Sequence, residues 1–477
     1  MKELQAENER LKKKNQELEQ MLKEALERIK ELEAQVGQNS RNSNWPSSRD
    51  KGRKKKRKNN NLRAKSDKKA GGQAGHKGHT LEFSDRPDKV ERHRPEKCEH
   101  CQQELSEQEA DECQRRQVID LPPLKIEVTE HQVECVTCPS CGQVNEGQFP
   151  EEVTNPVQYG AGIKTLAVYL KGQQLIPYGR SQQLLADLFG VSISQGSLEN
   201  FMQAAAHKVE PVIGQIKAGL IEAKVAHYDE SGFYIGGQRG WLHSTSTPWL
   251  TYYFPHLSRG KKALEAAGIL PNFQGVAVHD SWLTYWGYDH CDHALCNVHH
   301  LRELNAIAEN FQQSWASRFK VFLLSAKAAV DRAKAAGELA LPQEKVDQIK
   351  RLYTKLVTAA LQANPPPPDG WPKGSRGRPK KTKPRNLAER LQLRQDAVLA
   401  FVVDFKVPFD NNLAERDIRM LKLQQKISGC FRSTQGAQTF CDIRSYISTI
   451  RKQNLSVWLA LSSLFSGPIL EPDFSPE

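Results

Sequence analysis

Long apolar runs are absent from this chain of 477 residues. The two longest lie around Val321 to Val330 and Val457 to Phe465, and polar residues interrupt each well before the ~20 apolar positions that cross a bilayer. The amino terminus is charged from its second residue and lacks the apolar stretch of an export signal. We therefore expect a cytoplasmic protein with no membrane span.

Cysteine is scarce, with ten residues in the whole chain, and no Ser-His-Asp arrangement stands out. In an unexported chain, cysteines serve as metal ligands or buried thiols more often than as disulfides. The length suits about three domains at ~150 residues each.

Acidic residues are nearly missing from one basic stretch. Lys51 to Lys69 holds eleven Lys or Arg against the single acid Asp67, which gives a net charge of +10 within a chain of formal charge +12. Such a concentration of positive charge indicates a polyanionic partner.

Residues 1 to 36 carry a heptad pattern that predicts a two-stranded coiled coil. Positions a and d form an apolar seam, and opposite charges fall at g and e of parallel strands. Two Asn at a positions, Asn8 and Asn15, favour a defined register and a dimer. The alternative is a single charged amphipathic helix. The seam residues at a are Met1, Asn8, Asn15, Leu22, Ile29 and Val36, and those at d are Leu4, Leu11, Leu18, Ala25 and Leu32.

Residues 37 to 80 are polar, basic and rich in Asn, Ser and Gly, so we expect a disordered linker. A basic run can be only a solvated tail or a localisation signal. The glycines of Gly71 to His79, however, allow close backbone approach to phosphate. The residues expected to contact DNA here are Lys54, Lys55, Lys56, Arg57, Lys58 and Lys77.

Residues 81 to 150 contain two C-x2-C pairs, Cys98 with Cys101 and Cys138 with Cys141. Four thiolates in two such pairs suit tetrahedral Zn²⁺, so we predict a structural zinc ribbon. The spacing between the pairs is long, and Cys135 is an alternative partner for Cys138.

Residues 151 to 220 are predicted to be helical and to contain a helix-turn-helix. Ser181 to Phe189, a turn at Gly190, and a helix capped by Ser194 fit that motif. Small helical hairpins of other function have the same pattern.

An α/β sheet is predicted from residue 221. The expected strands are Val225 to Tyr228, Gly240 to Thr245, Leu250 to Phe254 and Gly275 to His279, with a helix at Lys261 to Ala267. We assign 221 to 303 to the first part of this core, 304 to 400 to a helical insertion whose segment Lys373 to Arg385 is a mobile basic arm, and 401 to 465 to the final core helices.

Two carboxylates follow buried strands. Asp229 is expected to end the strand Val225 to Tyr228, and Asp280 follows Gly275 to His279. Strands that end side by side would place both in one crevice, where a hard cation can neutralise them. The alternative is that each Asp only caps the turn after it.

A third carboxylate, Glu415, is predicted to lie on a helix capped by Asp410 or Asn411. Ala414, Ile418 and Leu421 share the face expected to pack on the sheet. Glu415 shares another face with cationic groups suited to phosphate. The candidates for phosphate contact are Arg416, Arg419 and Lys422.

Several motifs together resemble the insertion-sequence sixty-six type transposases. They are Tyr228-Asp-Glu-Ser-Gly232, Val278-His-Asp-Ser-Trp282, Cys296-Asn-Val-His-His-Leu-Arg-Glu-Leu304, Asn411-Asn-Leu-Ala-Glu-Arg416 and Ser428-Gly-Cys-Phe-Arg-Ser433, in addition to the Gly-rich segment and the cysteine pairs. They stand in the family's order along nearly the whole chain. Ala74, where the family has Pro, is a departure without catalytic consequence.

The resemblance implies a multidomain transposase: an N-terminal coiled coil, a zinc ribbon, a helical DNA-binding segment, and an α/β ribonuclease H-like core with a helical insertion. It implies an Asp-Asp-Glu triad at Asp229, Asp280 and Glu415. Two Mg²⁺ or Mn²⁺ ions would activate the attacking oxygen and stabilise the leaving oxygen. We expect Asp229 to bridge both ions, with Asp280 on one and Glu415 on the other.

The expected partners are the terminal inverted repeats of the element, target DNA, and a second copy or more of this chain in a synaptic complex associated with the nucleoid. The family also implies small companion proteins of the same element. Cys296 and His299 have a spacing that suits a further metal, and buried packing is the alternative for them. Two other functions fit parts of the pattern: a ribonuclease H-like nuclease without strand transfer, and a dimeric zinc-containing DNA-binding regulator.

Overall fold

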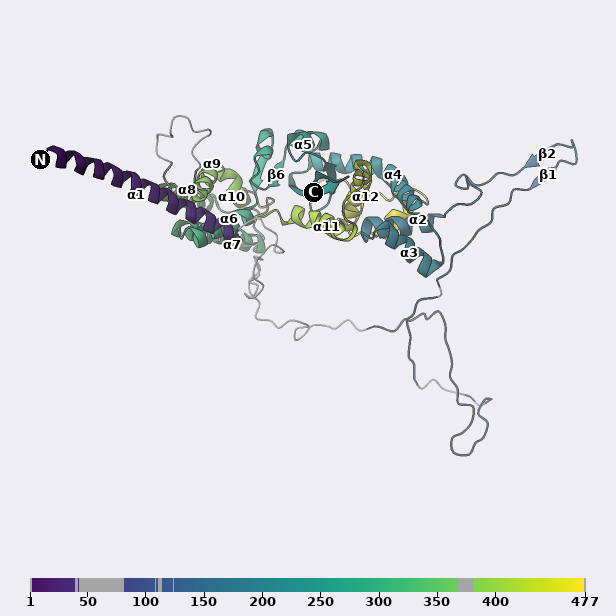
Figure 1. Ribbon diagram of the computed structural model, residues 1–477. Helices are drawn as coiled ribbons and strands as arrows, with labels where there is room; N and C mark the ends of the chain where they lie inside the picture. Colours follow the sequence, from purple (N-terminus) through teal and green to yellow (C-terminus); the bar gives the residue numbers. More distant parts are fainter. Residues whose placement is uncertain are drawn as a thin grey trace. The chain divides into compact units, whose positions relative to one another are not determined.

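The computed structural model describes residues 2–38, 42, 81–107, 109, 114–122, 124–366 and 381–475 (Figure 1). The predicted linker lies almost entirely outside these residues. So do the basic candidates Lys54, Lys55, Lys56, Arg57, Lys58 and Lys77. Their contact with DNA stays a prediction.

The chain divides into two units, one made of Arg57–Glu130 with Leu188–Gly190 and the other of the remaining residues. The second unit contains the sheet and its helices. The described helices are α1 (Lys2–Val36), α2 (Ala161–Val168), the π-helix η2 (Tyr169–Gln173), α3 (Tyr178–Phe189), α4 (Gln195–Glu222), α5 (Lys261–Ala267), the 3₁₀ helices η3 (Leu270–Asn272) and η4 (Leu283–Gly287), α6 (Asn297–Asn310), α7 (Ser314–Ala335), α8 (Gln343–Ala363), α9 (Lys383–Leu393), α10 (Gln395–Val403), α11 (Asn412–Ser428), α12 (Thr434–Lys452) and α13 (Val457–Ser463). The strands are β1 (Cys135–Thr137), β2 (Val144–Glu146), β3 (Val225–Ile235), β4 (Gln238–Ser246), β5 (Thr251–His256), β6 (Val276–His279) and β7 (Asp292–Leu295).

The core of the larger unit is a five-stranded sheet in the order β5-β4-β3-β6-β7. The strands β3, β4 and β5 form antiparallel pairs, whereas β6 runs parallel to β3 and β7 runs parallel to β6. The α/β class predicted from the sequence is therefore correct. The strand β7 was not predicted, because its four residues, Asp-His-Ala-Leu, are too few and too polar to show a strand pattern.

The strand β3 is longer than predicted, and Asp229 lies inside it rather than at its end. The stretch Asp229 to Gly232 has the composition of a turn, but antiparallel pairing with β4 extends from His227 to Ile235 and overrides that local preference. The turn comes later, at Gly236 and Gly237, whose φ angles of 54° and 81° suit a two-residue hairpin loop. What ends near Asp229 is the pairing with β6, whose last pair is His227 with Val278.

Helices cover both faces of the sheet. Alternate residues of β3 point to opposite faces: Ala226 and Tyr228 join a core that includes α4, α12 and α13, while Phe233 and Ile235 join a second core that includes α11. Asp229 has the parity of Phe233 and therefore faces the side covered by α11.

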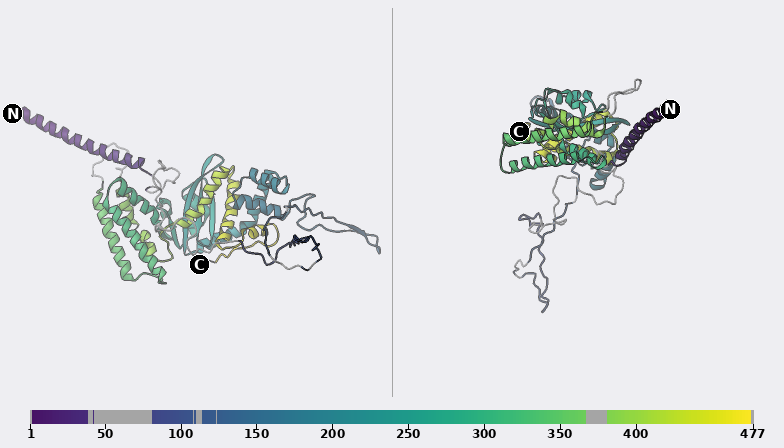
Figure 2. Two further views of the ribbon diagram at one scale, coloured as in Figure 1. Left: turned by 90° about the horizontal axis from the view of Figure 1, so that it is seen from below. Right: turned by 90° about the vertical axis from the view of Figure 1, so that its left-hand side faces the viewer.

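A bundle of helices, α6 to α10, stands between β7 and α11 in the sequence. Apolar residues from all five helices form one buried cluster, and Figure 2 shows the green helices of this bundle side by side. The start of α9 corrects the prediction of a mobile basic arm, because Lys383 to Arg385 are helical. Thr382 caps this helix by accepting a hydrogen bond from the Arg385 N–H.

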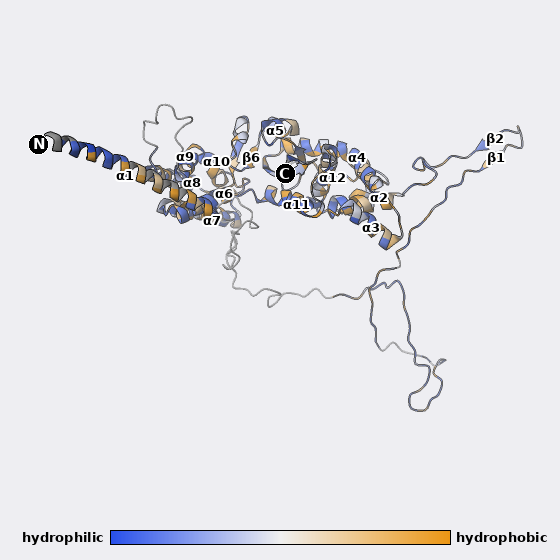
Figure 3. Cartoon of the chain, in the orientation of Figure 1, coloured by the Kyte–Doolittle hydropathy of each residue, from blue (hydrophilic) through white to orange (hydrophobic). Residues whose placement is uncertain are grey.

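The helix α1 is continuous over 35 residues, as the heptad pattern predicts. Figure 3 shows apolar patches recurring along it between hydrophilic ones. The described Leu, Ile and Val of the seam are 44 to 85 % exposed, with Leu32 and Val36 at the two ends of that range. Pairing with a second chain stays a prediction. No helix in the described part of the chain is long and apolar enough to cross a bilayer.

The predicted helix-turn-helix elements are present. The helix α3 ends at Phe189, Gly190 has a φ of 68°, and Ser194 caps α4 by accepting from the Ser197 N–H. The helix α4 is long, however, and Leu198, Met202 and seven other residues along it are buried, most of them in the core on the sheet. Its DNA-reading role stays a prediction.

Gly275 provides a test of the fold next to the strand that leads to Asp280. A Cβ at Gly275 would lie 2.5 Å and 2.6 Å from the carbonyl oxygens of Ala223 and Lys224, so Gly275→Ala should lower the free energy of unfolding by about 1–3 kcal/mol. Gly214→Ala is the control, because nothing lies within 4 Å of its Cβ and Ala favours the helix by about 0.5–1 kcal/mol. Chemical denaturation of both variants measures this; equal stability would contradict the close approach.

Candidate active site

Asp229 and Asp280 occupy matching positions on neighbouring parallel strands. His227 pairs with Val278, so continuing the register by two residues places Asp229 opposite Asp280. Side chains in matched register point to the same face of a sheet. Asp280 also caps its turn, because its Oδ1 accepts the Trp282 N–H at 2.8 Å. Both sequence interpretations of Asp280, site residue and turn cap, are therefore compatible.

Asn411 fixes the start of α11 above this face. Its side-chain amide donates to the Tyr228 carbonyl at 2.8 Å, and its Oδ1 lies 2.8 Å from the His227 Nδ1. The Tyr228 carbonyl lies just beyond the last β3–β6 pair, so the Asn411 amide donates the hydrogen bond that β6 does not supply there. One turn later comes Glu415, whose N–H donates to the Asn411 carbonyl.

The sequence had suggested Asp410 or Asn411 as the cap of α11, and the capping contact belongs to Asp410. Its Oδ1 accepts from the Asn412 N–H at 3.0 Å, whereas the side chain of Asn411 makes no cap hydrogen bond. Ala414, Ile418 and Leu421 are buried as predicted. Glu415 thus lies on an adjacent face of a helix whose orientation is fixed by packing.

The charges around Asp229 act on one another. Burial, together with the negative charges of Glu230, Glu415 and Asp280, raises the pKa of Asp229 to about 8. The Glu230 N–H, which donates to Asp229 Oδ1 at 2.9 Å, opposes this shift. All three predicted triad carboxylates therefore lie close enough to interact, and a cation there would relieve the repulsion.

Glu230 is a residue that sequence reasoning missed. It points to the other face of β3, and its carboxylate accepts from the Arg259 Nε at 2.8 Å and from the Tyr285 hydroxyl at 2.7 Å. Arg259 in turn lies 4.2 Å from the centre of the Trp282 ring. These contacts fix the position of Trp282, whose N–H donates to the Asp280 carboxylate. The sequence does show a second acid directly after Asp229, and this pair of adjacent acids could have identified Glu230 as part of the site.

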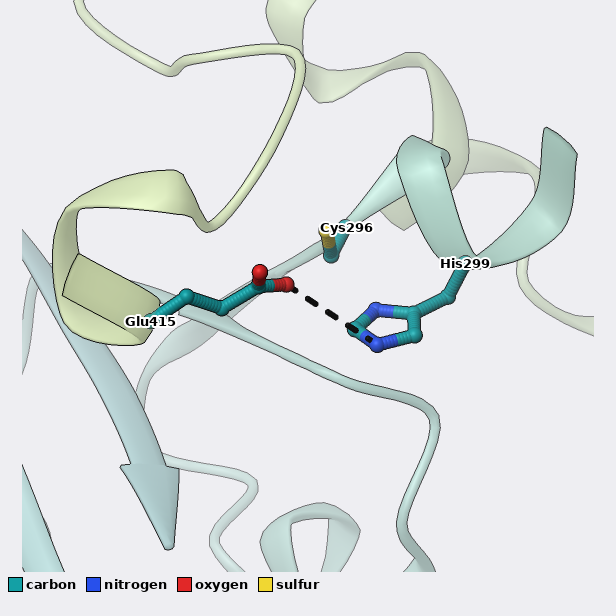
Figure 4. Close-up of side chains that lie close together, drawn as sticks. All are labelled: Cys296, His299 and Glu415. Carbon is teal, nitrogen blue, oxygen red and sulfur yellow. Dashed lines mark ion pairs between the residues drawn. The ribbon is translucent and has the colours of Figure 1, made fainter. Parts of the chain in front are cut away.

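Cys296, His299 and Glu415 form a second group of ligand atoms beside the triad. One ligand atom from each lies within 4.8 Å of the others, and Figure 4 shows the Glu415 carboxylate turned toward the other two side chains. His299 Nε2 is 3.9 Å from Glu415 Oε1. Burial raises the pKa of the Cys296 thiol to about 12 and lowers the pKa of His299.

The alternative acid on α11, Asp417, is committed elsewhere. Its Oδ2 accepts from the Lys452 Nζ at 2.8 Å, and both side chains are largely buried. A buried ion pair of this kind needs both partners. Asp417 is therefore a structural residue, which leaves Glu415 as the acid of this helix whose charge acts on Asp229.

A row of basic residues extends from Glu415 along α11. Arg416, Arg419 and Lys422 are exposed, and within the described part of the chain none of them forms an ion pair. Lys426, four residues after Lys422, continues the row and was overlooked in the sequence, although helical spacing from Glu415 predicts it. Unpaired cations beside a carboxylate site suit a phosphate backbone.

Comparison with known families identifies the region that contains this candidate site. Residues 156–439, more than half of the chain, match the model described as Transposase IS66 family. The chain belongs to this family. Residues 1–82 match a second model, a family of unknown function named DUF6444. No curated protein matches the chain.

Membership makes the chain a transposase of an insertion sequence, and it implies DNA binding and the use of divalent metal ions. The resemblance noted in the sequence is thereby confirmed. The matched region contains the sheet, the helical bundle and α11, and thus all three carboxylates.

The cysteine pairs of this transposase lie before the matched region and share one local geometry. The Cys98 and Cys138 N–H groups each donate to the carbonyl five residues on, at 2.8 Å. Backbone N–H groups directed at the sulfur lower the pKa of both thiols, which suits metal-binding thiolates.

The two pairs belong to different units, so a zinc ion shared by Cys98, Cys101, Cys138 and Cys141 stays a prediction. Cys135, which has the same C-x2-C spacing to Cys138, stays an alternative ligand to Cys141.

The pKa of Asp229 predicts how Mg²⁺ binding depends on pH. An unfolded Asp has a pKa of ~3.9, whereas Asp229 in the folded chain has a pKa of about 8. The protonated carboxyl therefore favours the metal-free fold at low pH, and this contribution to the free energy of unfolding is lost as the pH rises toward 8. Mg²⁺ binds the ionised carboxylate, so the increase in Tm that it causes should grow from pH 6 to about 8 and then level off. Asp229→Asn should remove this growth. A metal-induced Tm increase that is the same at every pH would contradict the assignment.

Proposed function

We propose that this transposase binds the ends of its element and uses Asp229, Asp280 and Glu415 to hold the divalent ions that catalyse strand cleavage and strand transfer. The observation that carries the proposal is the convergence of these three carboxylates: two on matched positions of parallel strands, and the third on a helix bonded to one of those strands.

The sheet supports a ribonuclease H-like core. Three antiparallel strands precede two parallel ones, and the order β5-β4-β3-β6-β7 places the first strand at the centre. In such a core, the central strand and its parallel neighbour supply the first two acids. The helical bundle α6 to α10 fits the role of the insertion that precedes the third.

The donor set fits Mg²⁺ or Mn²⁺. The ligands are carboxylate oxygens, which hard cations prefer, and a buried Glu415 Oε1 has no hydrogen-bond partner among the described residues. When bound, two such ions lower the pKa of the attacking water or 3′-hydroxyl and stabilise the leaving oxygen. Asp229, whose pKa is raised by the charges of both other carboxylates, would be the ligand shared by the two ions.

The protein's own groups orient the site. Trp282 holds one Asp280 oxygen, and Asn411 fixes the distance between β3 and α11. The DNA backbone would run along α11, where Arg416, Arg419, Lys422 and Lys426 offer charge to phosphates. The basic segment around Lys54 to Lys58 and Lys77 would add binding that does not depend on base sequence.

Two amino-terminal modules complete the proposal. We assign a structural Zn²⁺ to Cys98, Cys101, Cys138 and Cys141, on the basis of the matching geometry of the pairs. We assign dimerisation to α1, because its apolar seam is exposed along most of its length.

Substitution of the triad tests the catalytic proposal. Asp229→Asn, Asp280→Asn and Glu415→Gln each keep the side-chain shape and remove one ligand charge. Each should reduce Mg²⁺-dependent cleavage and strand transfer by orders of magnitude, because a misplaced ion serves neither the attacking nor the leaving oxygen. Binding to the element ends, measured by gel shift, should survive.

Asp410→Asn is the matched control for these variants. It removes a neighbouring charge and keeps an oxygen to accept the Asn412 N–H. Cleavage assays on labelled ends should show near-normal activity for it. Normal cleavage by Glu415→Gln would instead show that the third ligand is misassigned. Cleavage without joining of pre-cut ends would favour a nuclease.

Substitution in α1 tests dimerisation. Leu22→Lys with Ile29→Lys places two charges in the apolar seam and should convert a dimer to a monomer in sedimentation experiments. The control is Glu9→Gln with Glu17→Gln, which changes the net charge equally at positions outside the seam. A chain beginning at Gly37 that remains dimeric would show that other surfaces hold the copies together.

A further inference from the structure

Cys296 and His299 lie where β7 ends and α6 begins. The thiol is fully buried, and it accepts the Asn411 N–H at 3.2 Å. His299 follows one turn later, where its N–H donates to the Cys296 carbonyl. The C-x2-H spacing thus places a sulfur and an imidazole on one side of the helix start, directed at Glu415 (Figure 4).

Two polar atoms of this group form no hydrogen bond within the described part of the chain. His299 Nδ1 and Glu415 Oε1 are both buried without a hydrogen bond in the described part of the chain. Leaving such atoms unsatisfied costs free energy. A cation would satisfy this group, because a carboxylate, a thiolate and the basic nitrogen of a neutral imidazole all donate electron pairs to a metal ion.

The donor chemistry differs from that of the triad. Mg²⁺ prefers an octahedron of oxygens, whereas thiolate and imidazole favour Zn²⁺ and similar transition metals. A tetrahedral zinc site has bonds of about 2.0–2.3 Å, which place its ligands about 3.3–3.8 Å apart. The His299–Glu415 separation of 3.9 Å is already close to this range.

We infer that Cys296, His299 and Glu415 form a second cation site, which binds Zn²⁺ with a water as fourth ligand. The thiol proton is released on binding, and the Asn411 N–H stabilises the resulting thiolate. This site differs from the cysteine pairs near the amino terminus and shares only Glu415 with the triad.

The shared carboxylate gives the site a consequence, which rests on the proposed function. Zn²⁺ bound to Cys296 and His299 competes with the Mg²⁺ site for the Glu415 carboxylate, which then serves the triad less well. Zinc therefore acts as an inhibitor of Mg²⁺-dependent cleavage, and its effect is exerted through Cys296 and His299.

The zinc content of the full-length chain tests the site directly. Wild type, Cys296→Ser and His299→Ala are equilibrated with Zn²⁺ at one fixed free concentration and assayed by elemental analysis. Each variant should hold one ion per chain fewer than wild type, whatever the cysteine pairs bind. Serine can still accept the Asn411 N–H, and His299 makes no side-chain hydrogen bond, so both variants should fold.

Cys430→Ser is the control, because this cysteine is exposed and outside the group. It should retain the zinc content of wild type. Equal content in wild type and both variants of the group overturns the inference.

A cleavage assay separates this inference from the proposed function. For each protein, the rate of cleavage in Mg²⁺ with added Zn²⁺ is divided by the rate without Zn²⁺. This ratio should be about one tenth or less for wild type, because zinc competes for one triad ligand. The ratio for His299→Ala should stay near one. An equal fall in both overturns the sharing of Glu415. Absence of cleavage under every condition counts against the proposed function alone, since zinc content is measured without DNA.

Discussion

The geometry of the candidate active site depends on Asn411, whose side chain forms hydrogen bonds with β3 rather than capping its own helix. Pairing of β3 with β6 stops at His227, so the next outward carbonyl, that of Tyr228, has no strand partner. The Asn411 amide takes this carbonyl, and its backbone N–H reaches the Cys296 sulfur. One buried residue thus joins β3, the end of β7 and the start of α11. The three segments carry Asp229, Cys296 and Glu415, so Asn411 holds the backbones of these residues together.

Charge is concentrated in this region at the expense of stability. Burial and three neighbouring carboxylates raise the pKa of Asp229, and a folded protein tolerates such a cost where function requires it. Arg259 and Tyr285 hold the Glu230 carboxylate on one face of β3. On the other face, among the described residues, Asp229 forms no ion pair, and the Oε1 of Glu415 has no hydrogen-bond partner. The two faces of β3 therefore differ. One holds an ion-paired acid that braces the loop after β6, and the other holds the acids of the proposed metal site.

Much of this arrangement follows from the sequence, and the remainder depends on distant pairing. The strand at Gly275 to His279 and the helix at Lys261 to Ala267 were predictable because their patterns are local. The extension of β3 through Asp229 to Gly232 was not, because its residues favour a turn and only β4 makes them a strand. Glu230 was overlooked for the same reason, since its partners Arg259 and Tyr285 are far along the chain. The triad residues themselves could be named from motifs, but their shared face required the register of β3 and β6.

The proposed catalysis requires a cation held jointly by Asp229, Asp280 and Glu415. The most direct measurement is a crystal structure of the full-length chain grown with Mn²⁺ and element-end DNA, in which anomalous scattering locates the ions. We expect at least one Mn²⁺ that is bound by carboxylate oxygens of Asp229 and Asp280. Glu415 should bind the same ion or a second one beside it. Ordered Mn²⁺ bound elsewhere, with these three side chains remote from it while the scissile phosphate occupies the site, would contradict the central claim.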